Sequence, residues 1–445
     1  MNTPIYDFVK KYGENDVARF HMPGHKGVSL VGCECLDITE ISGADVLYSP
    51  DGIIAESENN ATALFGTRHT FYSTEGSTLA IKAMLALIKR RIPHGKKTTV
   101  LAARNAHKSF LYACALLDIE IKWLYPEVFE HLCSCKISAS ELRSALNKCN
   151  TLPDAVYITS PDYIGNLSDV AGLSDVCHKN GIPLLVDNAH GAYLAFTEPS
   201  MHPIHLGADM CSDSAHKTLP VLTGGAYLHV SKRFEADEQE VREALSLFAS
   251  TSPSYLILQS LDLCNKYLAS GYREALCKHI TKLELVKQQL AHTGLSTEPS
   301  EPLKLVFSRS TCGYNGDELA AHLRANMIEP EFWDRDTLVL MSTPMITDGD
   351  IERIINALNS LSKRSPYQST TVPRPEILQP RISPREAMLS VCETVPTEHS
   401  VGRICACPTV SCPPAVPIVM SGEQISERAI ELMLYYGIKK IEVIK

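Results

Sequence analysis

The sequence predicts an α/β fold built around a mainly parallel β-sheet. Short apolar segments typical of buried strands alternate with helical segments over residues 65–230, which is the pattern of a parallel sheet covered by helices on both faces. Clusters of polar residues follow several of these strands, at the edge where ligands gather in such sheets. Smaller groups of strands and helices occupy residues 302–362 and the chain after residue 385.

Hydrophobic patterning and helix-start residues give the individual elements. Strands are expected over residues 70–72, 98–102, 119–124, 154–159, 182–186, 209–211 and 225–230. Helices are expected over residues 6–12, 56–65, 79–88, 110–117, 137–149 and 169–180. Ser138, with Glu141 three residues later, is typical of a capping box at the start of one of these helices.

The chain is expected to contain five parts. These are an N-terminal arm (1–30), a large domain (31–255), a small α/β domain (256–364), a linker (365–385) and a C-terminal α+β tail domain (386–445). The linker is rich in Pro, Ser and Thr, as interdomain segments often are. In the later parts, helices are expected within 235–290 and over 317–326, 350–362, 384–393 and 426–436, with strands over 303–307, 338–341 and 441–444.

Composition excludes several classes of protein. The 445 residues carry a formal net charge of −9 and no Lys/Arg-rich tract, so we expect no nucleic-acid partner. The N-terminus has no basic segment followed by an apolar one, and no run of about 18 apolar residues occurs. We therefore expect a cytoplasmic protein that does not span a membrane.

Fifteen cysteines fit reduced thiols in such a compartment. Three close groups were weighed as metal sites: Cys33/Cys35, Cys133/Cys135 and Cys405/Cys407/Cys412. Their Cys-x-Cys spacing is not that of a zinc knuckle, and no second pair follows at matching spacing. We interpret them as small buried side chains and predict no metal site.

Five polar segments follow expected strands and should share one edge of the sheet. They are Gly76-Ser77-Thr78, His107, Ser160 to Tyr163, Asp187 to His190, and Ser214 to Lys217. The first is a turn opening a helix, where free N–H groups and the helix dipole favour a phosphate. Simple capping by Ser77 or Thr78 explains that turn equally well.

Lys217 is the centre of these segments. A lysine among Ser, Ala and His that is partly desolvated can lose its charge and act as a nucleophile toward an aldehyde. Asp187, at a neighbouring strand end, is suited to pair with a protonated ring nitrogen, and His107 to stack on the ring. His190 and His216 flank the same site and are candidates for proton transfer.

Those roles together are what pyridoxal 5′-phosphate requires. Its phosphate would be held by four residues, Gly76, Ser77, Thr78 and Ser214. A plain nucleotide-binding α/β protein that uses the Gly76 turn remains an alternative at this point.

The motifs also resemble one family closely. They include His21 to Gly27, Asp37 to Glu40, Gly43 to Leu47, Ala63 to Gly66, Arg104 to Ser109, Thr159 to Tyr163, Asp187 to Ala192, Ser214 to Leu219, and Cys412 to Pro417 with Ser421-Gly422-Glu423. These segments resemble the Orn/Lys/Arg decarboxylase family, and within it the shorter Gram-positive branch. That resemblance implies the aspartate-aminotransferase-like (type I) fold of pyridoxal-phosphate enzymes for the large domain.

The resemblance implies a reaction and roles. Lys217 would hold the cofactor, Asp187 would pair with its ring nitrogen, His107 would stack on the ring, and Ser77, Thr78 and Ser214 would bind phosphate. The reaction would remove the α-carboxylate of arginine, lysine or ornithine as CO2 and leave agmatine or a diamine, as in polyamine biosynthesis. Members build the active site across a dimer, so a homodimer is expected, with the His21–Gly27 loop or the tail near the substrate entrance.

Departures and alternatives remain open. Ala415 replaces a usual Gly, and Asp162 stands where a Thr is common, so Asp162 is a candidate for attracting a cationic substrate. Glu423 is a candidate for the substrate's distal cation, or else a surface carboxylate at a helix start. Another type I reaction, such as transamination or aldol cleavage, or a non-catalytic paralogue, would keep the same cofactor residues.

Overall fold

The computed structural model describes residues 1–129, 131–367, 375–409 and 416–445. The signature residues Cys412 to Ala415 and part of the expected linker lie outside these ranges. The chain divides into two compact units. Unit 1 contains residues 1–100, 149–160 and 170–275, and unit 2 contains residues 101–148, 161–169 and 276–445.

Seven strands form the main sheet, in the order β1-β7-β6-β5-β4-β2-β3. Their bounds are β1 His69–Ser73, β2 Thr98–Ala103, β3 Ile119–Leu124, β4 Ala155–Thr159, β5 Leu184–Asp187, β6 Met210–Asp213 and β7 Ala226–Val230. All seven expected strands are therefore present, each within three residues of its predicted ends. β2 runs through the boundary between the units and β3 belongs to unit 2.

The sheet is mixed rather than uniformly parallel. β4, β5 and β6 pair in parallel, while β7 runs antiparallel to both β6 and β1. The segment between β6 and β7 contains only the single helical turn Ala215–Thr218 and no long crossover helix, and β7 returns beside β6 in the opposite direction. β1 and β6 consequently point the same way, and their carboxyl ends meet at one edge.

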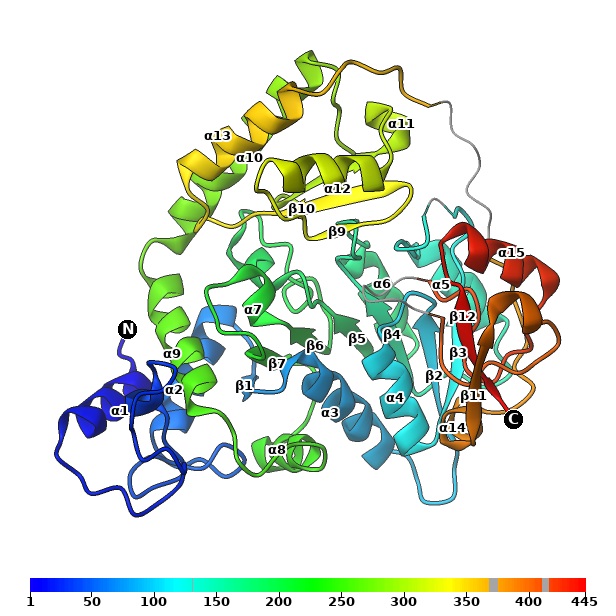
Figure 1. Ribbon diagram of the computed structural model, residues 1–445. Coiled ribbons are helices and arrows are strands. Elements are labelled where there is room, and N and C mark those ends of the chain that lie inside the picture. Colours follow the sequence, from blue (N-terminus) through cyan, green and yellow to red (C-terminus); the bar gives the residue numbers. More distant parts are fainter. Residues whose placement is uncertain (130, 368–374, 410–415) are drawn as a thin grey trace. The chain divides into compact units, whose positions relative to one another are not determined.

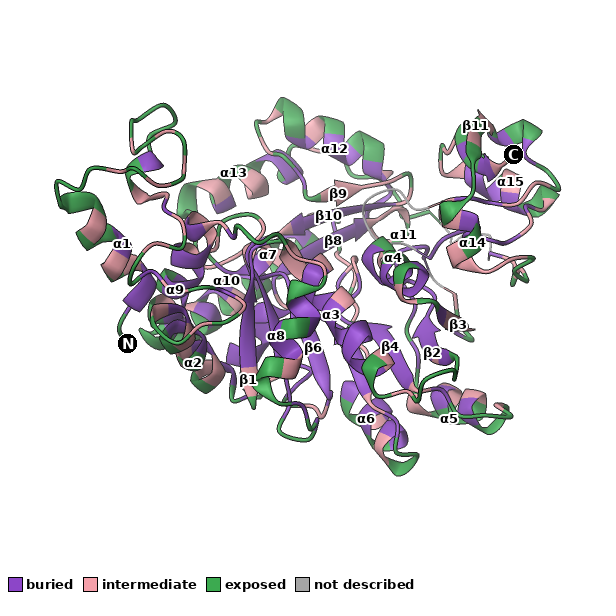
Figure 2. Cartoon of the chain, turned by 90° about the horizontal axis from the view of Figure 1, so that it is seen from below, coloured by how far each residue is buried: buried purple, intermediate pink, exposed green. Residues whose placement is uncertain are grey.

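Helices of unit 1 lie around this part of the sheet, some directly on it and others on neighbouring helices (Figure 1). They are α1 Pro4–Glu14, α2 Ile53–Phe65, α3 Gly76–Arg90, α6 Val170–Lys179, α7 Ala215–Thr218, α8 Glu238–Ser246 and α9 Tyr255–Ala269, with short 3-10 turns at Glu34–Leu36 and Ala192–Phe196. α3 buries nine of its residues, from Leu79 to Ile88, as expected of a helix within a core. Figure 2 shows β4 and β6 almost entirely in the buried colour.

Unit 2 holds two small sheets besides β3. Their strand orders are β8-β10-β9 and β11-β12. The strands are β8 Lys304–Ser308, β9 Phe332–Trp333, β10 Thr337–Met341, β11 Cys392–Pro396 and β12 Lys440–Ile444. The helices are α4 Lys108–Leu117, α5 Ala139–Asn147, α11 Arg309–Cys312, α12 Gly316–Ala325, α13 Asp348–Asn359, α14 Pro384–Leu389 and α15 Glu427–Tyr435, with a 3-10 turn at Thr397–His399. α10 Tyr272–His292 begins in unit 1 and continues into unit 2.

One expected helix is wrong in its second half. The helix predicted over 384–393 ends at Leu389, and Cys392 already belongs to β11. β11 pairs antiparallel with β12, so that Cys392 lies opposite Ile444. The capping box of Ser138 and Glu141 is confirmed at the start of α5.

The described cysteines are all free thiols, and most are buried. The interpretation as small buried side chains is confirmed for Cys133, Cys135 and Cys405. It is wrong for Cys35, which is exposed, and Cys33 and Cys407 are only partly buried. Among the described residues, no helix combines the length and the apolar character needed to cross a membrane.

Candidate active site

Lys217 lies in a single helical turn, α7, which follows β6 directly. Its Nζ is 3.2 Å from Nε2 of His190, and the side chain is half-buried. The turn is closed by the Leu219 N–H donating to Ala215 O. The amine and the imidazole that the sequence placed at one sheet edge are therefore in contact.

Asp187 ends β5 and is 2% exposed. The Tyr157 hydroxyl donates to its Oδ2 at 3.2 Å, and the Ala189 N–H donates to Oδ1 at 3.2 Å. Burial raises the pKa of Asp187, and the nearby Lys217 ammonium opposes that rise. No pattern in the sequence distinguishes Tyr157, because its position inside β4 is that of an ordinary buried strand residue.

The Gly76 turn opens α3 as expected. The N-cap is Glu75, whose side chain makes no capping hydrogen bond, so the alternative in which Ser77 or Thr78 caps the helix is wrong. Gly76 has a φ of +70°, which glycine adopts without strain. Ser214 Oγ donates to Ser77 Oγ at 2.9 Å, so the hydroxyls expected to bind phosphate are brought together from two distant segments.

His216 has a structural contact in this turn. Its Nδ1–H donates to Gly225 O at 2.9 Å, and burial lowers the pKa of its imidazole. This bond connects α7 to the Thr223-Gly224-Gly225 loop. Proton transfer by His216 stays a prediction.

His107 belongs to unit 2, where it caps α4. Its Nδ1 accepts from the Ser109 N–H at 3.1 Å and lies 2.7 Å from Ser109 Oγ. These bonds fix the ring at the carboxyl side of β2, as the sequence predicted. Stacking on a cofactor stays a prediction.

The two candidates for substrate recognition, Asp162 and Glu423, are both buried in unit 2. Asp162 accepts from the Asn166 backbone N–H at 2.8 Å and from its side-chain amide at 2.9 Å, and burial raises its pKa. Glu423 is 1% exposed, so the interpretation of a surface carboxylate is wrong. Arg104 donates to both of its oxygens, at 2.9 and 2.8 Å. Contact of either carboxylate with a substrate stays a prediction.

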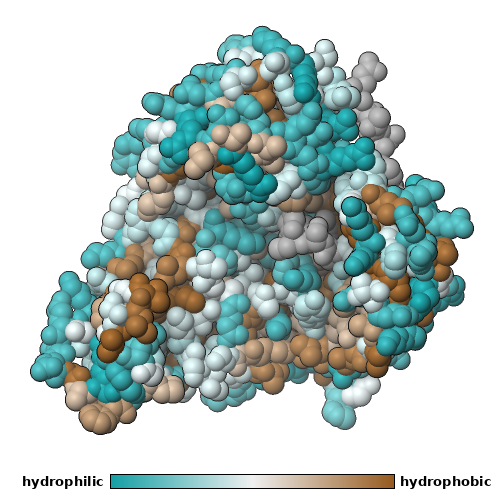
Figure 3. Space-filling view, viewed as in Figure 1, coloured by the Kyte–Doolittle hydropathy of each residue, from teal (hydrophilic) through white to brown (hydrophobic). Residues whose placement is uncertain are grey.

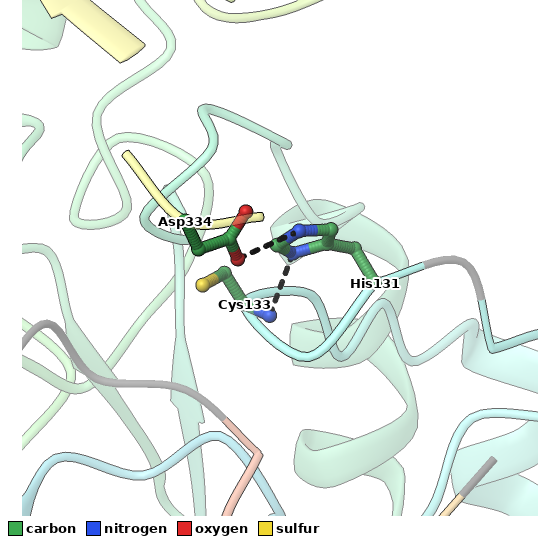
Figure 4. Close-up of side chains that lie close together, drawn as sticks. All are labelled: His131, Cys133 and Asp334. Atoms are coloured by element: carbon green, nitrogen blue, oxygen red, sulfur yellow. Dashed lines mark hydrogen bonds and ion pairs between the residues drawn. The ribbon is translucent and has the colours of Figure 1, made fainter. Parts of the chain in front are cut away.

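His131, Cys133 and Asp334 gather in unit 2 (Figure 4). The Cys133 N–H donates to His131 Nδ1 at 3.0 Å, and His131 Nε2 lies 3.3 Å from an Asp334 oxygen. An imidazole that accepts at Nδ1 carries its proton at Nε2, so Nε2 donates to the carboxylate and has no lone pair left for an ion. These hydrogen bonds account for the cluster without a metal.

Curated proteins similar to this chain include three from Bacillus and a related genus. The chain is 30% identical to the "Uncharacterized protein YaaO" of Bacillus subtilis, over 97% of this chain and 93% of that protein. It is 29% identical to the "Arginine decarboxylase" of the same organism, over 96% and 92%. It is 30% identical to the "Arginine decarboxylase" of Halalkalibacterium halodurans, over 96% and 91%.

Solved structures with the same fold include lysine decarboxylases. The enzyme LdcF of Francisella novicida gives a TM-score of 0.82 at 16% identity, covering 100% of this chain and 81% of that one. Lysine decarboxylase A of Pseudomonas aeruginosa gives 0.82 at 18%, covering 99% and 80%. The serine palmitoyltransferase of Sphingomonas wittichii gives 0.54 at 16%, covering 81% and 83%. The expected aspartate-aminotransferase-like α/β fold is confirmed.

Two family models match, and together they span most of the sequence. Residues 3–307 match the major domain of Orn/Lys/Arg decarboxylases, and residues 364–440 match the C-terminal domain of the same enzymes. The motif resemblance and the full-length relatives point the same way. The chain belongs to the Orn/Lys/Arg decarboxylase family.

Proposed function

We propose that this protein is a pyridoxal-phosphate-dependent decarboxylase that converts a basic L-amino acid into an amine and CO2. The observation that carries the proposal is the grouping of Lys217, His190 and Asp187 at one edge of the unit 1 sheet. Arginine is the first substrate to test, because several relatives of nearly full coverage are named arginine decarboxylase.

The residues present fit the cofactor. The N-cap of α3, Glu75, makes no side-chain capping hydrogen bond, and the positive end of the helix dipole favours a phosphate there. The Gly76 N–H itself donates to Gly224 O at 2.7 Å. Ser77 lies in the first turn of this helix, and its hydroxyl is paired with that of Ser214. Asp187 is a buried carboxylate with a raised pKa, and such a carboxylate is stabilised when a cationic N–H group pairs with it.

Each of these residues has a task in the reaction. Pyridoxal phosphate, when bound, supplies a ring that accepts the electrons left at Cα as CO2 departs. Lys217 would hold the cofactor through its amine, and Asp187 would pair with the ring nitrogen. His190 Nε2, 3.2 Å from Lys217 Nζ, would be placed to hold or move a proton at that amine.

Two competing functions use the same residues. Transamination or aldol cleavage would need the same cofactor contacts, and a non-catalytic paralogue would bind the cofactor without turnover. Family membership favours decarboxylation over both. Measuring CO2, amine and keto-acid products from arginine, lysine and ornithine separates the three cases.

The decisive experiment combines that substrate panel with two lysine variants. Lys217→Ala should abolish CO2 release and the visible absorbance of the bound cofactor, because no other group would replace its amine. Lys232→Ala, which changes an exposed lysine of the same unit, should keep both. A wild-type protein that binds the cofactor and decarboxylates none of the three amino acids would refute the proposed function.

We also propose that the protein works as a homodimer. The N-terminal arm carries Phe20 at 96% and Leu30 at 82% exposure, and Val31 directly after it is 87% exposed. Exposed apolar side chains that gather on a surface commonly mark protein contacts. Figure 3 shows hydrophobic atoms in the lower left, where Figure 1 draws the N-terminal part of the chain. Light scattering of the purified protein should give twice the chain mass.

A further inference from the structure

A buried carboxylate that plays no part in the proposed chemistry lies directly before the lysine turn. Asp213 is the last residue of β6, and Ser214 follows it as the N-cap of α7. Asp213 is 0% exposed, and so are His202 and His229 beside it. All three lie in unit 1.

The two oxygens of Asp213 receive four donors. Oδ1 accepts from Asn188 Nδ2 at 2.7 Å and from the Cys211 thiol at 3.3 Å. Oδ2 accepts from His202 Nε2 at 3.0 Å and from His229 Nε2 at 3.1 Å. Since every partner donates, the position requires a group that accepts on both sides, and among side chains of this size only an ionised carboxylate does so.

The charge state agrees with this geometry. Burial alone would raise the pKa of Asp213, but the imidazoles of His202 and His229 outweigh burial and hold it well below its usual value. Burial lowers the pKa of His202 despite the adjacent carboxylate, so His202 is neutral. The network is therefore one buried carboxylate surrounded by N–H and S–H donors, which is how buried charges are tolerated.

The same network connects the strand ends that carry the active site. Asn188 follows Asp187 at the end of β5, and Asp213 precedes Ser214. His229 in β7 lies opposite Cys211 in β6 and opposite Thr70 in β1, and its Nδ1 lies 2.9 Å from Thr70 Oγ1. One carboxylate thus joins the segment bearing Asp187 to the segment bearing Lys217.

The turn after Asp187 is built closely around Asn188. A Cβ on Gly191 would lie 1.9 Å from Asn188 Oδ1, so only a glycine allows the backbone at position 191 to lie this close to the Asn188 amide. Because His190 lies between these residues, the amide that Asp213 holds also supports the residue in contact with Lys217.

A metal is the other use of such donors. Ligand atoms of His202, Cys211 and Asp213 lie within 4.8 Å of one another. However, His202 Nδ1 accepts from the Ile204 N–H at 3.4 Å, which puts the ring proton on Nε2, and both imidazole Nε2 atoms donate to one carboxylate oxygen. The hydrogen bonds satisfy these donors without an ion.

We propose that Asp213 is a positioning residue, whose carboxylate fixes Asn188 and the start of the Ser214–Lys217 turn and thereby sets how Asp187 and Lys217 face the cofactor. The effect on cofactor binding rests on the proposed function. The ordering of the two segments is a property of the protein alone.

The test uses Asp213→Asn, which keeps shape and volume. The NH2 group of the new amide must face either the NH2 group of Asn188 or the two imidazole N–H groups, and a buried donor left unsatisfied in this way destabilises the network. We expect hydrogen exchange of the cofactor-free protein to rise about tenfold in the peptides containing residues 187–191 and 212–218. We expect the dissociation constant of pyridoxal phosphate to rise at least about tenfold, since small displacements at such sites have large effects.

Two further variants separate positioning from general destabilisation. Asp262→Asn changes another fully buried carboxylate of unit 1, which accepts from Ser57 Oγ and the N–H groups of Ile5 and Tyr6. It should leave exchange in the two peptides and cofactor affinity within about twofold of wild type. The double variant Asn188→Asp/Asp213→Asn should recover most of the lost affinity. The new amide at position 213 can donate to the new carboxylate at position 188 and still accept from both imidazoles.

The outcomes are distinct. Unchanged exchange in Asp213→Asn would overturn the inference whether or not the cofactor binds, and so would equal effects of Asp213→Asn and Asp262→Asn. Stoichiometric zinc in the wild type that is lost in Asp213→Asn would replace the hydrogen-bond account with a metal site. If the wild-type protein does not bind pyridoxal phosphate but hydrogen exchange is still faster in Asp213→Asn, the ordering role is supported. Only the proposed function is then refuted.

Discussion

The ion pair between Arg104 and Glu423 gives the sharpest prediction for the tail domain. Both side chains are 1% exposed, and two parallel hydrogen bonds of 2.9 and 2.8 Å join them. The Arg104 guanidinium also lies 5.1 Å from the Trp123 ring centroid and 5.4 Å from that of Tyr125. Glu423→Gln would leave this cation buried against aromatic rings with a neutral partner.

The expected loss follows from burial. Removing one partner of a buried pair costs about 3–5 kcal/mol, because the remaining charge stays desolvated. For a cooperative unit of a few hundred residues, each kcal/mol shifts Tm by roughly 2–4 °C. Glu423→Gln should therefore lower the Tm of the transition that reports on unit 2 by roughly 6–20 °C.

The assay is thermal unfolding followed by circular dichroism, with an exposed ion pair as control. Arg403 and Glu393 form a 2.8 Å pair in the same tail, with side chains 36% and 42% exposed. Exposed pairs contribute about 0–1 kcal/mol, so Glu393→Gln should shift Tm by at most roughly 4 °C. Glu423→Gln with the Tm of wild type and a raised KM would refute the structural account and favour a direct contact with the substrate's distal cation.

Three further predictions concern unit 1. His190→Gln should lower kcat for the preferred amino acid about 10²–10⁴-fold while cofactor absorbance persists; unchanged kcat would exclude His190 from proton transfer. Gly224→Ala should destabilise the protein by more than about 1 kcal/mol in urea unfolding, because Gly224 has φ +100° and an added Cβ would lie 3.0 Å from Thr74 O. Burial raises the pKa of Asp262 to about 6 from 3.8; since the unfolded chain ionises first, stability should fall by about 3 kcal/mol as pH rises through that window. Asp262→Asn should remove this fall, and an unchanged pH profile would contradict the assignment.

Much of the fold was predictable because its signals are local. Buried strands such as Ala155–Thr159 and Leu184–Asp187 are short apolar runs bounded by turn residues, and capping boxes mark helix starts within four residues. β11 was missed because its stability depends on β12, whose partner residue Ile444 is far from Cys392 in the sequence. Strand pairing of that kind has no local pattern.

The candidate site divides in the same way. The placement of Lys217, Asp187 and Ser77 at or just after strand ends was predictable from the strand pattern, while their roles in catalysis stay predictions. Asp213 stands among them in sequence, but nothing local distinguishes it. Its role depends on His202 and His229, which reach it from other segments, and sequence alone does not show that three such residues converge.

Asp187 and Asp213 end the adjacent strands β5 and β6, and they differ in how far their charge is compensated by the protein. Asp213 has four donors, two of them imidazoles, and its pKa is held low, so its charge is fully compensated within the protein. Asp187 is equally buried, but it receives weaker donors from hydroxyls and one N–H group, and burial raises its pKa. A buried carboxylate that is only partly compensated is a candidate for function. Asp187 would gain most from one more cationic N–H group, and the protonated ring nitrogen of the proposed cofactor is such a group.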